Sequence, residues 1–293
     1  MKTHKKIALA GATGYLGRHI VHQLLLNRYE FVALARNVSK LQALGLAESQ
    51  IAEVQVTEPE TLTNVFEGVD TVISTVGITR QKDGLTYMNV DYQANMNLLN
   101  EALSAGVRKF VYVSAVNGQQ FRHLKIMEAK EKFVDALQAS GLEYTVLRPN
   151  GFFSDMQDFL DMARRGRVYL FGNGEYKLNP ITGEDLAEVC LQAVDSNQTE
   201  ISVGGPDVLT QNQIGELALD AQSQPAKITH IPDWVRKTAI TLVRTFTSSK
   251  TYGPIEFFPT MMGQDNIAPH YGHHRLADFF RQQARNKEKV LVP

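Results

Sequence analysis

The sequence has little of several features that mark specialised protein classes. Among 293 residues there is one cysteine, Cys190, so no intramolecular disulfide can form. No apolar run approaches the roughly 18 residues that span a bilayer or forms a signal-peptide core. Lys and Arg number 30 against 31 Asp and Glu, which excludes the broad basic field of a general nucleic-acid binder. These absences indicate a soluble, cytoplasmic protein with no transmembrane segment and no general nucleic-acid binding.

The rest of the composition is that of an ordinary globular chain. Apolar residues make up 43% and charged residues 21%, close to the roughly 45–50% and 25% of globular domains. Cys190 lies in a helical pattern over 184–193, and a nucleophilic cysteine needs a histidine partner. We therefore interpret it as a buried, inert thiol.

Short apolar runs alternate with amphipathic segments in the first half of the chain. The expected strands are Ile7–Ala10, Phe31–Ala35, Ala52–Val56, Thr71–Val76, Phe110–Ser114 and Tyr144–Leu147. The helical patterns between them are Tyr15–Asn27, Pro59–Glu67, Met88–Ala105 and Ile126–Ser140. Continuous apolar strands that alternate with helices predict an α/β fold with a doubly wound parallel sheet covered on both faces.

The pattern changes after Arg148. Residues 151–180 are rich in aromatics and glycine, a helix is expected at about 183–194, and a strand follows at Glu200–Val203. The last third is helical with several prolines. We expect one domain of residues 1–150, to which 181–204 return, and a smaller, mainly helical domain of 151–180 and 205–293.

The first strand leads directly into a glycine-rich turn that opens a helix. Gly11, Gly14 and Gly17 stand three residues apart, a variant of the dinucleotide-binding fingerprint. Gly11 permits the tight turn, Gly14 lets a pyrophosphate approach the backbone, and Gly17 lets helix and strand pack closely. The helix N-terminus then favours the anion. The motif predicts NAD(P) binding in a Rossmann-type domain.

The end of the second strand distinguishes the two cofactors. An acidic residue about 20 positions past the glycines binds the ribose of NAD, whereas an arginine accommodates the 2′-phosphate of NADP. Arg36 stands 36 − 17 = 19 residues past Gly17, and Lys40 follows. We expect NADP(H) in preference to NAD(H), which would require other ribose contacts.

Several motifs resemble the atypical short-chain dehydrogenase/reductase superfamily, especially NmrA-like proteins and the nucleotide-binding accessory subunit of respiratory complex I. The resemblance covers most of the chain and implies a sheet of about seven strands with the cofactor across the strand C-termini. The motifs are Gly11–Gly17, Leu34–Asn37, Gly68–Ser74, Asn89–Tyr92, Lys109–Ala115, Leu147–Gly151 and Gly204–Pro206.

The resemblance also implies which residues contact the cofactor. Many relatives have an Asp at the adenine where this sequence has Gln55, whose amide can still form hydrogen bonds. The positions near the pyrophosphate are Thr13, Tyr15 and Leu16. Those along the adenosine ribose and pyrophosphate are Ser74, Thr75, Val76 and Gly77. Those beside the nicotinamide and its ribose are Val113, Ser114, Ala115, Lys130, Pro149, Asn150 and Gly151.

One residue of the usual catalytic set is missing. Classical members of the superfamily use Ser, Tyr and Lys, and the Tyr is the acid or base. Here Ser114 and Lys130 match the family, but Ile126 occupies the tyrosine position. Tyr112 is expected to point away from the neighbours of Ser114. Lys130 either serves alone as acid/base, which requires a lowered pKa, or only binds ribose hydroxyls.

Histidines and an amphipathic segment near the C-terminus offer further alternatives. His270, His273 and His274 could form a metal site with Asp265 and Asp278, but the segment has the pattern of the start of an amphipathic helix, so we expect no metal site.

Residues 232–246 combine apolar and basic side chains. We favour a lid helix there over peripheral membrane or partner contact.

Two functions remain open. The first is an NADP(H)-dependent oxidoreductase acting on a small apolar carbonyl or conjugated substrate that Phe152 and Phe153 would contact. The second is a non-catalytic NADP(H)-binding redox sensor or an assembly or scaffold factor with a protein partner, which the missing tyrosine favours.

Overall fold

The computed structural model describes residues 5–78, 84–225 and 227–291. The chain divides into two compact units. Unit 1 comprises Met1–Arg148 and Leu186–Ile201, and unit 2 comprises Pro149–Asp185 and Ser202–Pro293. Within the described ranges, no helix is both long enough and apolar enough to cross a membrane.

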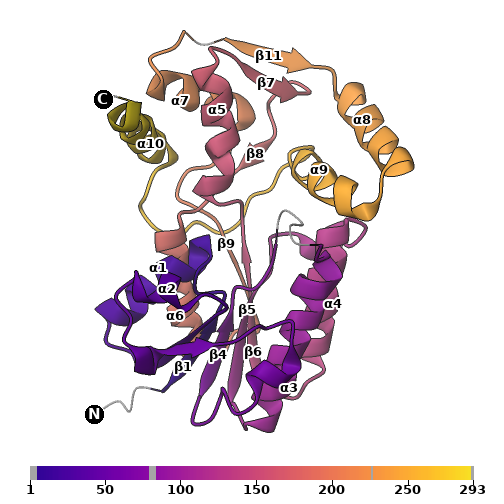
Figure 1. Ribbon diagram of the computed structural model, residues 1–293. Helices are drawn as coiled ribbons and strands as arrows, with labels where there is room; N and C mark the ends of the chain where they lie inside the picture. The colour runs from indigo at the N-terminus through magenta and orange to yellow at the C-terminus, as the bar shows by residue number, and fades with distance from the viewer. Residues whose placement is uncertain (1–4, 79–83, 226, 292–293) are drawn as a thin grey trace. The chain divides into compact units, whose positions relative to one another are not determined.

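A seven-stranded sheet forms the centre of unit 1 (Figure 1). Its spatial order is β3-β2-β1-β4-β5-β6-β9, and the pairings from β3 to β6 are parallel. From β1, the strands β2 and β3 follow toward one edge of the sheet, and β4, β5 and β6 follow toward the other, as in doubly wound sheets. The predicted α/β fold is therefore confirmed. The strands are β1 (Ile7–Ala10), β2 (Phe31–Ala35), β3 (Ile51–Glu53), β4 (Thr71–Ser74), β5 (Lys109–Val113), β6 (Glu143–Pro149) and β9 (Glu200–Val203).

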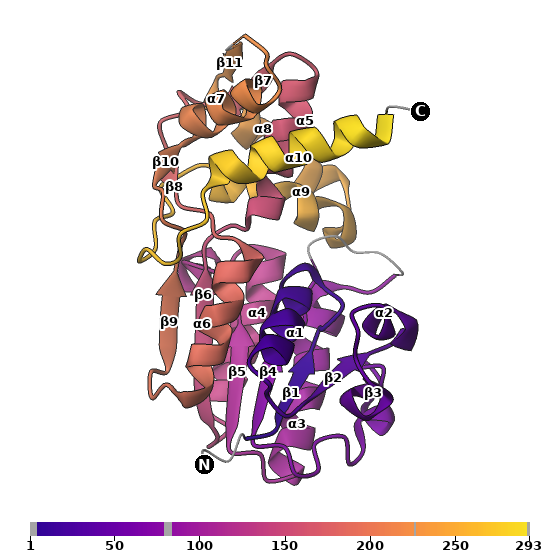
Figure 2. The same cartoon turned by 90° about the vertical axis from the view of Figure 1, so that its left-hand side faces the viewer.

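Helices cover both faces of this sheet, which explains why its central strands are apolar throughout. α1 (Tyr15–Leu26) and α6 (Gly183–Asp195) lie on one face, while α3 (Asn95–Ser104) and α4 (Lys125–Gln138) lie on the other (Figures 1 and 2). The short α2 (Val38–Gln42) follows β2. The core beneath α3 and α4 includes Val72, Phe110, Leu98 and Phe133.

Two expected helices depart from regular α-helix. Only Pro59–Leu62 of the predicted Pro59–Glu67 helix forms, as the 3₁₀ turn η2. Thr61 Oγ1 bonds the backbone carbonyls of Gln55 and Glu58, a local alternative to helical pairing. The segment expected at Met88–Ala105 begins with the π-helical turn η3 (Met88–Ala94) before α3. Such π turns occur frequently at functional sites.

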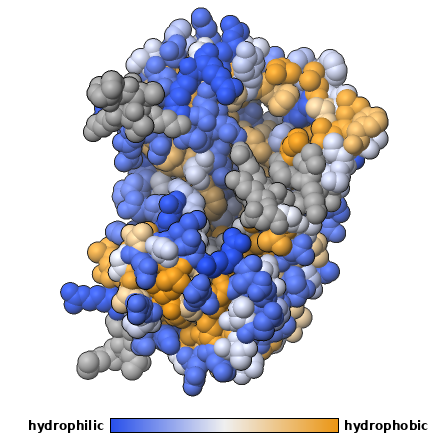
Figure 3. Space-filling model, viewed as in Figure 1, coloured by the Kyte–Doolittle hydropathy of each residue, from blue (hydrophilic) through white to orange (hydrophobic). Residues whose placement is uncertain are grey.

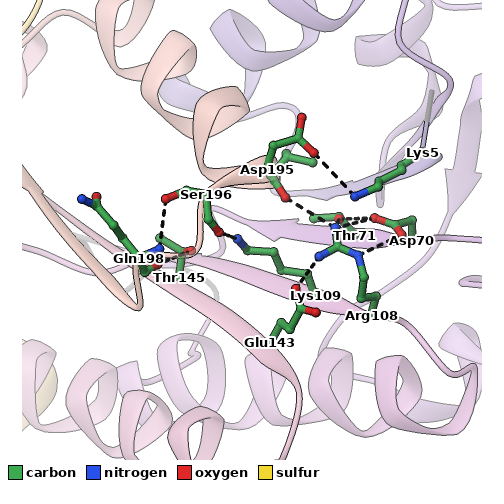
Figure 4. A network of polar contacts seen from close by, with 11 residues as sticks. Lys5, Asp70, Thr71, Arg108, Lys109, Glu143, Thr145, Asp195, Ser196 and Gln198 are labelled. Atoms are coloured by element: carbon green, nitrogen blue, oxygen red, sulfur yellow. Dashed lines mark hydrogen bonds and ion pairs between the residues drawn. The ribbon is translucent and has the colours of Figure 1, made fainter. Parts of the chain in front are cut away.

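A network of polar contacts lies where the central strands begin (Figure 4). Arg108 pairs with Asp70 at 2.8 Å. Lys109 is buried and donates to the backbone carbonyl of Ser196. Burial lowers the pKa of its amine. Thr145 Oγ1 donates to the Gln198 carbonyl at 2.7 Å. These contacts hold the segment after α6 against β5 and β6 before it enters β9.

Unit 2 is mainly helical, as expected. A core of buried side chains, including Phe153, Phe159, Ile214 and Phe280, joins three of its helices. β7 and β11 pair in parallel, and β8 and β10 are antiparallel. The helices are α5 (Gln157–Arg164), α7 (Gln211–Ala221), α8 (Asp233–Phe246), α9 (Ser249–Met261) and α10 (Leu276–Leu291). The strands are β7 (Val168–Phe171), β8 (Lys177–Leu178), β10 (Leu209–Thr210) and β11 (Ile228–Ile231).

Candidate nucleotide-binding and catalytic site

The turn from β1 to α1 requires two of its three glycines for conformation and packing. Gly11 has φ +85°, and a Cβ there would lie 2.4 Å from Thr75 Oγ1. Its carbonyl accepts the Gly14 amide at 2.9 Å. A Cβ at Gly17 would lie 2.1 Å from the Gly11 carbonyl oxygen. Side chains at Gly11 and Gly17 would therefore collide with the protein itself.

Gly14 differs because the protein leaves space beside it. Gly14 is exposed, and a Cβ there would approach only the Gly11 carbonyl oxygen, at 3.2 Å. It precedes α1 with extended backbone and no capping side chain. A helix start without a side chain in front of it favours an anion. This cradle, with half-buried Thr13 and Tyr15 and buried Leu16 around it, fits a pyrophosphate.

Two cations follow the end of β2, the strand beside β1. Arg36 and Lys40 are both exposed. Asn37 accepts the Lys40 backbone amide at 3.2 Å and thereby starts α2. Gln55 follows β3, half-buried, and its backbone is bonded to Thr61 Oγ1. The two cations therefore occupy the strand end where the ribose end of a dinucleotide is recognised in this fold.

The residues at the end of β4 hold neighbouring strands and helices together. Ser74 donates to Asn95 Oδ1 at 2.6 Å and accepts the Val76 amide. Thr75 Oγ1 donates to the Ala10 carbonyl at 3.2 Å. Val76 is buried and Gly77 is exposed. The backbone after β4 is therefore fixed beside the glycine turn.

Lys130 is held by a buried carboxylate. Its Nζ lies 3.0 Å from Asp91 Oδ1, and the Asp91 side chain has no exposed surface. Asp91 Oδ2 also accepts the Ile78 amide at 3.2 Å. A Cβ at Gly77 would lie 2.6 Å from Asp91 Oδ1 and 2.8 Å from Lys130 Nζ. Gly77 thus lets the backbone pass directly against this ion pair.

The electrostatics keep Lys130 charged. Burial lowers the pKa of its amine, but the neighbouring Tyr112 and Asp91 outweigh that effect, so the pKa of Lys130 is raised. The lowered pKa that acid/base catalysis by a lone lysine requires is therefore not found. The Lys130 ammonium can bind hydroxyls and stabilise developing negative charge.

The expectation that Tyr112 points away from the neighbours of Ser114 is wrong. The two residues stand two positions apart along an extended segment, so their side chains share one face. The Tyr112 ring packs edge-on against Phe133 of α4, with ring centres 4.6 Å apart, and its centre lies 5.6 Å from Lys130 Nζ. Burial raises the pKa of the Tyr112 hydroxyl.

Ser114 belongs to a second buried ion cluster. Its hydroxyl donates to Glu131 Oε1 at 2.8 Å. Arg148 donates to both carboxylate oxygens of Glu131, at 2.6 and 2.9 Å, and its Nε lies 2.8 Å from Glu200 Oε2. The Glu131 side chain has no exposed surface. In this structure the Ser114 hydroxyl therefore fixes β5 to α4, and its catalytic role stays a prediction.

The remaining expected contacts are placed as follows. Val113 is buried, and Ala115 is half-buried with its carbonyl beside Arg148. Pro149 is buried in β6. The Asn150 amide donates to Asn179 Oδ1 at 2.7 Å, and its oxygen accepts the Gly151 amide at 2.8 Å. Asn150 thus stabilises unit 2 internally, and a role beside the nicotinamide stays a prediction.

The two predicted substrate residues differ in exposure. Phe152 is half-buried, whereas Phe153 is 1% exposed and packs against Phe279 with ring centres 5.6 Å apart. Phe153 is therefore a core residue of unit 2 in this structure. Cys190 is buried as expected, and burial raises the pKa of its thiol.

α8 leaves an apolar surface uncovered. The exposed fractions of Trp234, Leu242 and Phe246 are 66%, 51% and 79%, and apolar side chains gather over α8 in Figure 3. The helix packs against β7 and α9. A lid function for α8 stays a prediction.

Known proteins are similar to this chain in sequence, and solved structures are similar to it in fold. Residues 11–197 match a family model described as NAD(P)H-binding. The photosystem II assembly factor Ycf39 of Guillardia theta is 30% identical over 232 residues, which cover 77% of this chain and 73% of that relative. The chloroplastic divinyl chlorophyllide a 8-vinyl-reductase of Zea mays is 26% identical over 317 residues, covering 95% and 79%.

A solved structure has the same fold. The NADPH-dependent quinone oxidoreductase of Escherichia coli, complexed with NADPH, matches with a TM-score of 0.71 at 18% identity, over 94% of this chain and 99% of that chain. That likeness concerns the fold alone, whereas the family model spans more than half of the sequence. The chain belongs to the NAD(P)H-binding family whose model matches residues 11–197.

Proposed function

We propose that the protein is an NADP(H)-dependent reductase of a conjugated apolar substrate. The observation that carries this proposal is the 3.0 Å ion pair of Lys130 with the buried Asp91 in the nucleotide-binding unit, together with the buried Ile126 at the position of the usual proton donor. Ile126 has no proton to give, and the Lys130 ammonium is suited to stabilising negative charge.

That combination suits a conjugated double bond better than an isolated carbonyl. NADPH, when bound, supplies a hydride that forms one new C–H bond as the π bond breaks, while water gives the proton for the second. Reduction of an isolated carbonyl concentrates charge on one oxygen and calls for a matched acid. In a conjugated substrate the charge is spread, so the Lys130 ammonium can stabilise it electrostatically.

The sequence relatives support the same reaction class. The maize relative that aligns with 95% of this chain is named as a reductase of a vinyl group. A vinyl group on a macrocycle is a conjugated double bond on an apolar compound. We therefore infer that the substrate of this chain is an enone, a quinone or a vinyl-bearing aromatic macrocycle.

Arg36→Glu tests the preference for NADP(H). Arg36 is exposed directly after β2, where a guanidinium pairs with the 2′-phosphate and a carboxylate repels it. We expect NADPH binding to weaken by more than about 1.5 kcal/mol, the scale of a charge-assisted hydrogen bond, with little change for NADH. Titration calorimetry with both nucleotides measures this.

A charge-matched variant serves as the control. Arg165→Glu makes the same change in net charge at an exposed position of unit 2, and we expect its NADPH affinity to equal that of the wild type. Equal losses for NADPH and NADH in Arg36→Glu would contradict a 2′-phosphate role.

Lys130→Met tests the proposed reaction. With NADPH and a panel of enones, quinones and a vinyl-bearing chlorin, we expect the wild type to oxidise NADPH in step with substrate loss. Lys130→Met should lower kcat/KM by about 100-fold, as when one preorganised donor is removed. Lys130→Arg keeps the charge and should retain more activity than Lys130→Met.

Lys132→Met is the matched control, since Lys132 lies on the same helix, exposed, with its amine 4.4 Å from the centre of the Tyr92 ring. It should leave turnover unchanged. Circular dichroism confirms that each variant is folded. An active wild type whose rate is unaffected by Lys130→Met would refute the assigned role.

A non-catalytic assembly or scaffold function is the second candidate. The exposed apolar surface of α8 favours it, and the alga relative at 30% identity is named as an assembly factor. Tight NADPH binding without turnover of any compound in the panel would support this second function over the first.

A further inference from the structure

Two adjacent histidines of unit 2 lie against a buried carboxylate that the sequence did not pair with them. Asp185 belongs to the first turn of α6 and is fully buried, while His273 and His274 precede α10. Asp265 and Asp278, the acids nearest in sequence, are engaged elsewhere. Asp265 accepts the Lys177 amide at 2.7 Å, and Asp278 pairs with Arg281 at 3.2 Å.

The oxygens of Asp185 have different partners. Oδ2 accepts the backbone amide of His274 at 3.4 Å. Oδ1 lies 2.8 Å from Nδ1 of His274 and 4.0 Å from Nδ1 of His273. One oxygen therefore anchors the loop, and the other faces two imidazole nitrogens.

The spacing of these atoms is close to that of a metal-ligand set. One ligand atom from each of Asp185, His273 and His274 lies within 4.8 Å of the other two. In a tetrahedral zinc site, with bonds of about 2.0–2.1 Å, neighbouring ligand atoms are about 3.3 Å apart. The His273 side chain is 80% exposed, so its ring can rotate inward without disturbing the core.

A second carboxylate and the loop backbone support this arrangement. Glu184 Oε2 lies 3.5 Å from Nε2 of His274. A proton held on Nε2 by Glu184 leaves the Nδ1 lone pair for a metal, the usual role of an outer carboxylate at a metal-bound histidine. Gly272 has φ +78°, and a Cβ there would lie 2.2 Å from the Asp185 carboxyl carbon. The backbone at Gly272 therefore packs directly against the Asp185 carboxylate. This close approach places the next two residues, His273 and His274, beside the carboxylate.

We propose that Asp185, His273 and His274 bind one divalent transition-metal ion of the zinc type, with water completing the coordination. Two imidazoles and one carboxylate suit Zn²⁺, Co²⁺ or Ni²⁺, whereas Mg²⁺ and Ca²⁺ prefer oxygen ligands alone. The ion takes the place between Asp185 Oδ1 and Nδ1 of His274, which lie 2.8 Å apart in this structure. It joins the start of α6 to the loop before α10 and so stabilises unit 2.

Titration calorimetry of the full-length, metal-free protein with Zn²⁺, and separately with Mg²⁺, tests this proposal. We expect one equivalent of Zn²⁺ to bind with an affinity in the micromolar range or tighter, and Mg²⁺ not to bind. Co²⁺ should bind in place of Zn²⁺ and give the visible absorption bands of a low-coordinate site. His273→Asn should weaken Zn²⁺ binding at least 10-fold.

His270→Asn is the matched control, because His270 is an exposed histidine of the same loop outside the cluster. It should leave the affinity unchanged. His274→Asn should weaken binding as His273→Asn does, whereas Asp185→Asn also removes the loop anchor and is less informative. Failure of Zn²⁺ to bind, or binding that His273→Asn and His270→Asn affect equally, would overturn the proposal.

Discussion

Gly14→Val is expected to abolish the binding of both NADPH and NADH. Gly14 stands at the start of α1 where a Cβ meets only one protein atom, at 3.2 Å. The variant can therefore fold, while the valine side chain occupies the space into which a pyrophosphate would fit. We expect a loss of at least about 100-fold in affinity, or about 2.8 kcal/mol, measured by calorimetry or by nucleotide fluorescence.

The control for this variant is His22→Val. It places the same β-branched residue at an exposed position within α1, away from the turn. His22→Val should bind both nucleotides normally. Normal affinity in Gly14→Val would show that the pyrophosphate does not bind at this helix start.

Arg148→Met is expected to cost about 3–5 kcal/mol in the free energy of unfolding. Arg148 donates two hydrogen bonds to Glu131, which has no exposed side-chain surface. Removal of the guanidinium leaves the buried Glu131 carboxylate with one side-chain hydrogen-bond partner among the described residues, the Ser114 hydroxyl. Chemical denaturation followed by circular dichroism measures the loss, and Arg148→Met combined with Glu131→Met should recover much of it.

An exposed ion pair provides the comparison. Arg122 pairs with Asp135 at 2.6 Å, but both side chains are well exposed, so Arg122→Met should cost no more than about 1 kcal/mol. Similar losses for Arg122→Met and Arg148→Met would mean that the Glu131 cluster contributes no more than a surface pair.

The sheet could be predicted in detail because its signals are local. The bounds of β1, β2 and β9 are as predicted. β1 and β2 are short buried apolar runs, and β9 ends directly before Gly204 and Gly205. The structure differs from the predicted helix Pro59–Glu67 because the Thr61 and Thr63 hydroxyls donate to nearby backbone carbonyls. The π turn before α3 has no signature in the apolar pattern.

The charged partners of the site could not be predicted, because they come from distant segments. Lys130 is predicted from the sequence, but nothing in the sequence indicates that Asp91 pairs with it, and Tyr112 and Asp91 together raise the pKa of its amine. Glu131 was missed for the same reason. The face of the sheet toward which the Tyr112 side chain points could have been predicted. Tyr112 and Ser114 are two residues apart, and alternate residues of an extended segment point to the same face.

The most direct test of the proposed reductase is to follow the hydride. The protein is incubated with NADPH that carries deuterium at C4 on either face, together with a conjugated substrate from the panel. We predict that deuterium from one face alone appears on carbon in the reduced product, and that Lys130→Met slows this transfer. NADPH that stays bound and unoxidised, with no deuterium in any product, would contradict the reductase.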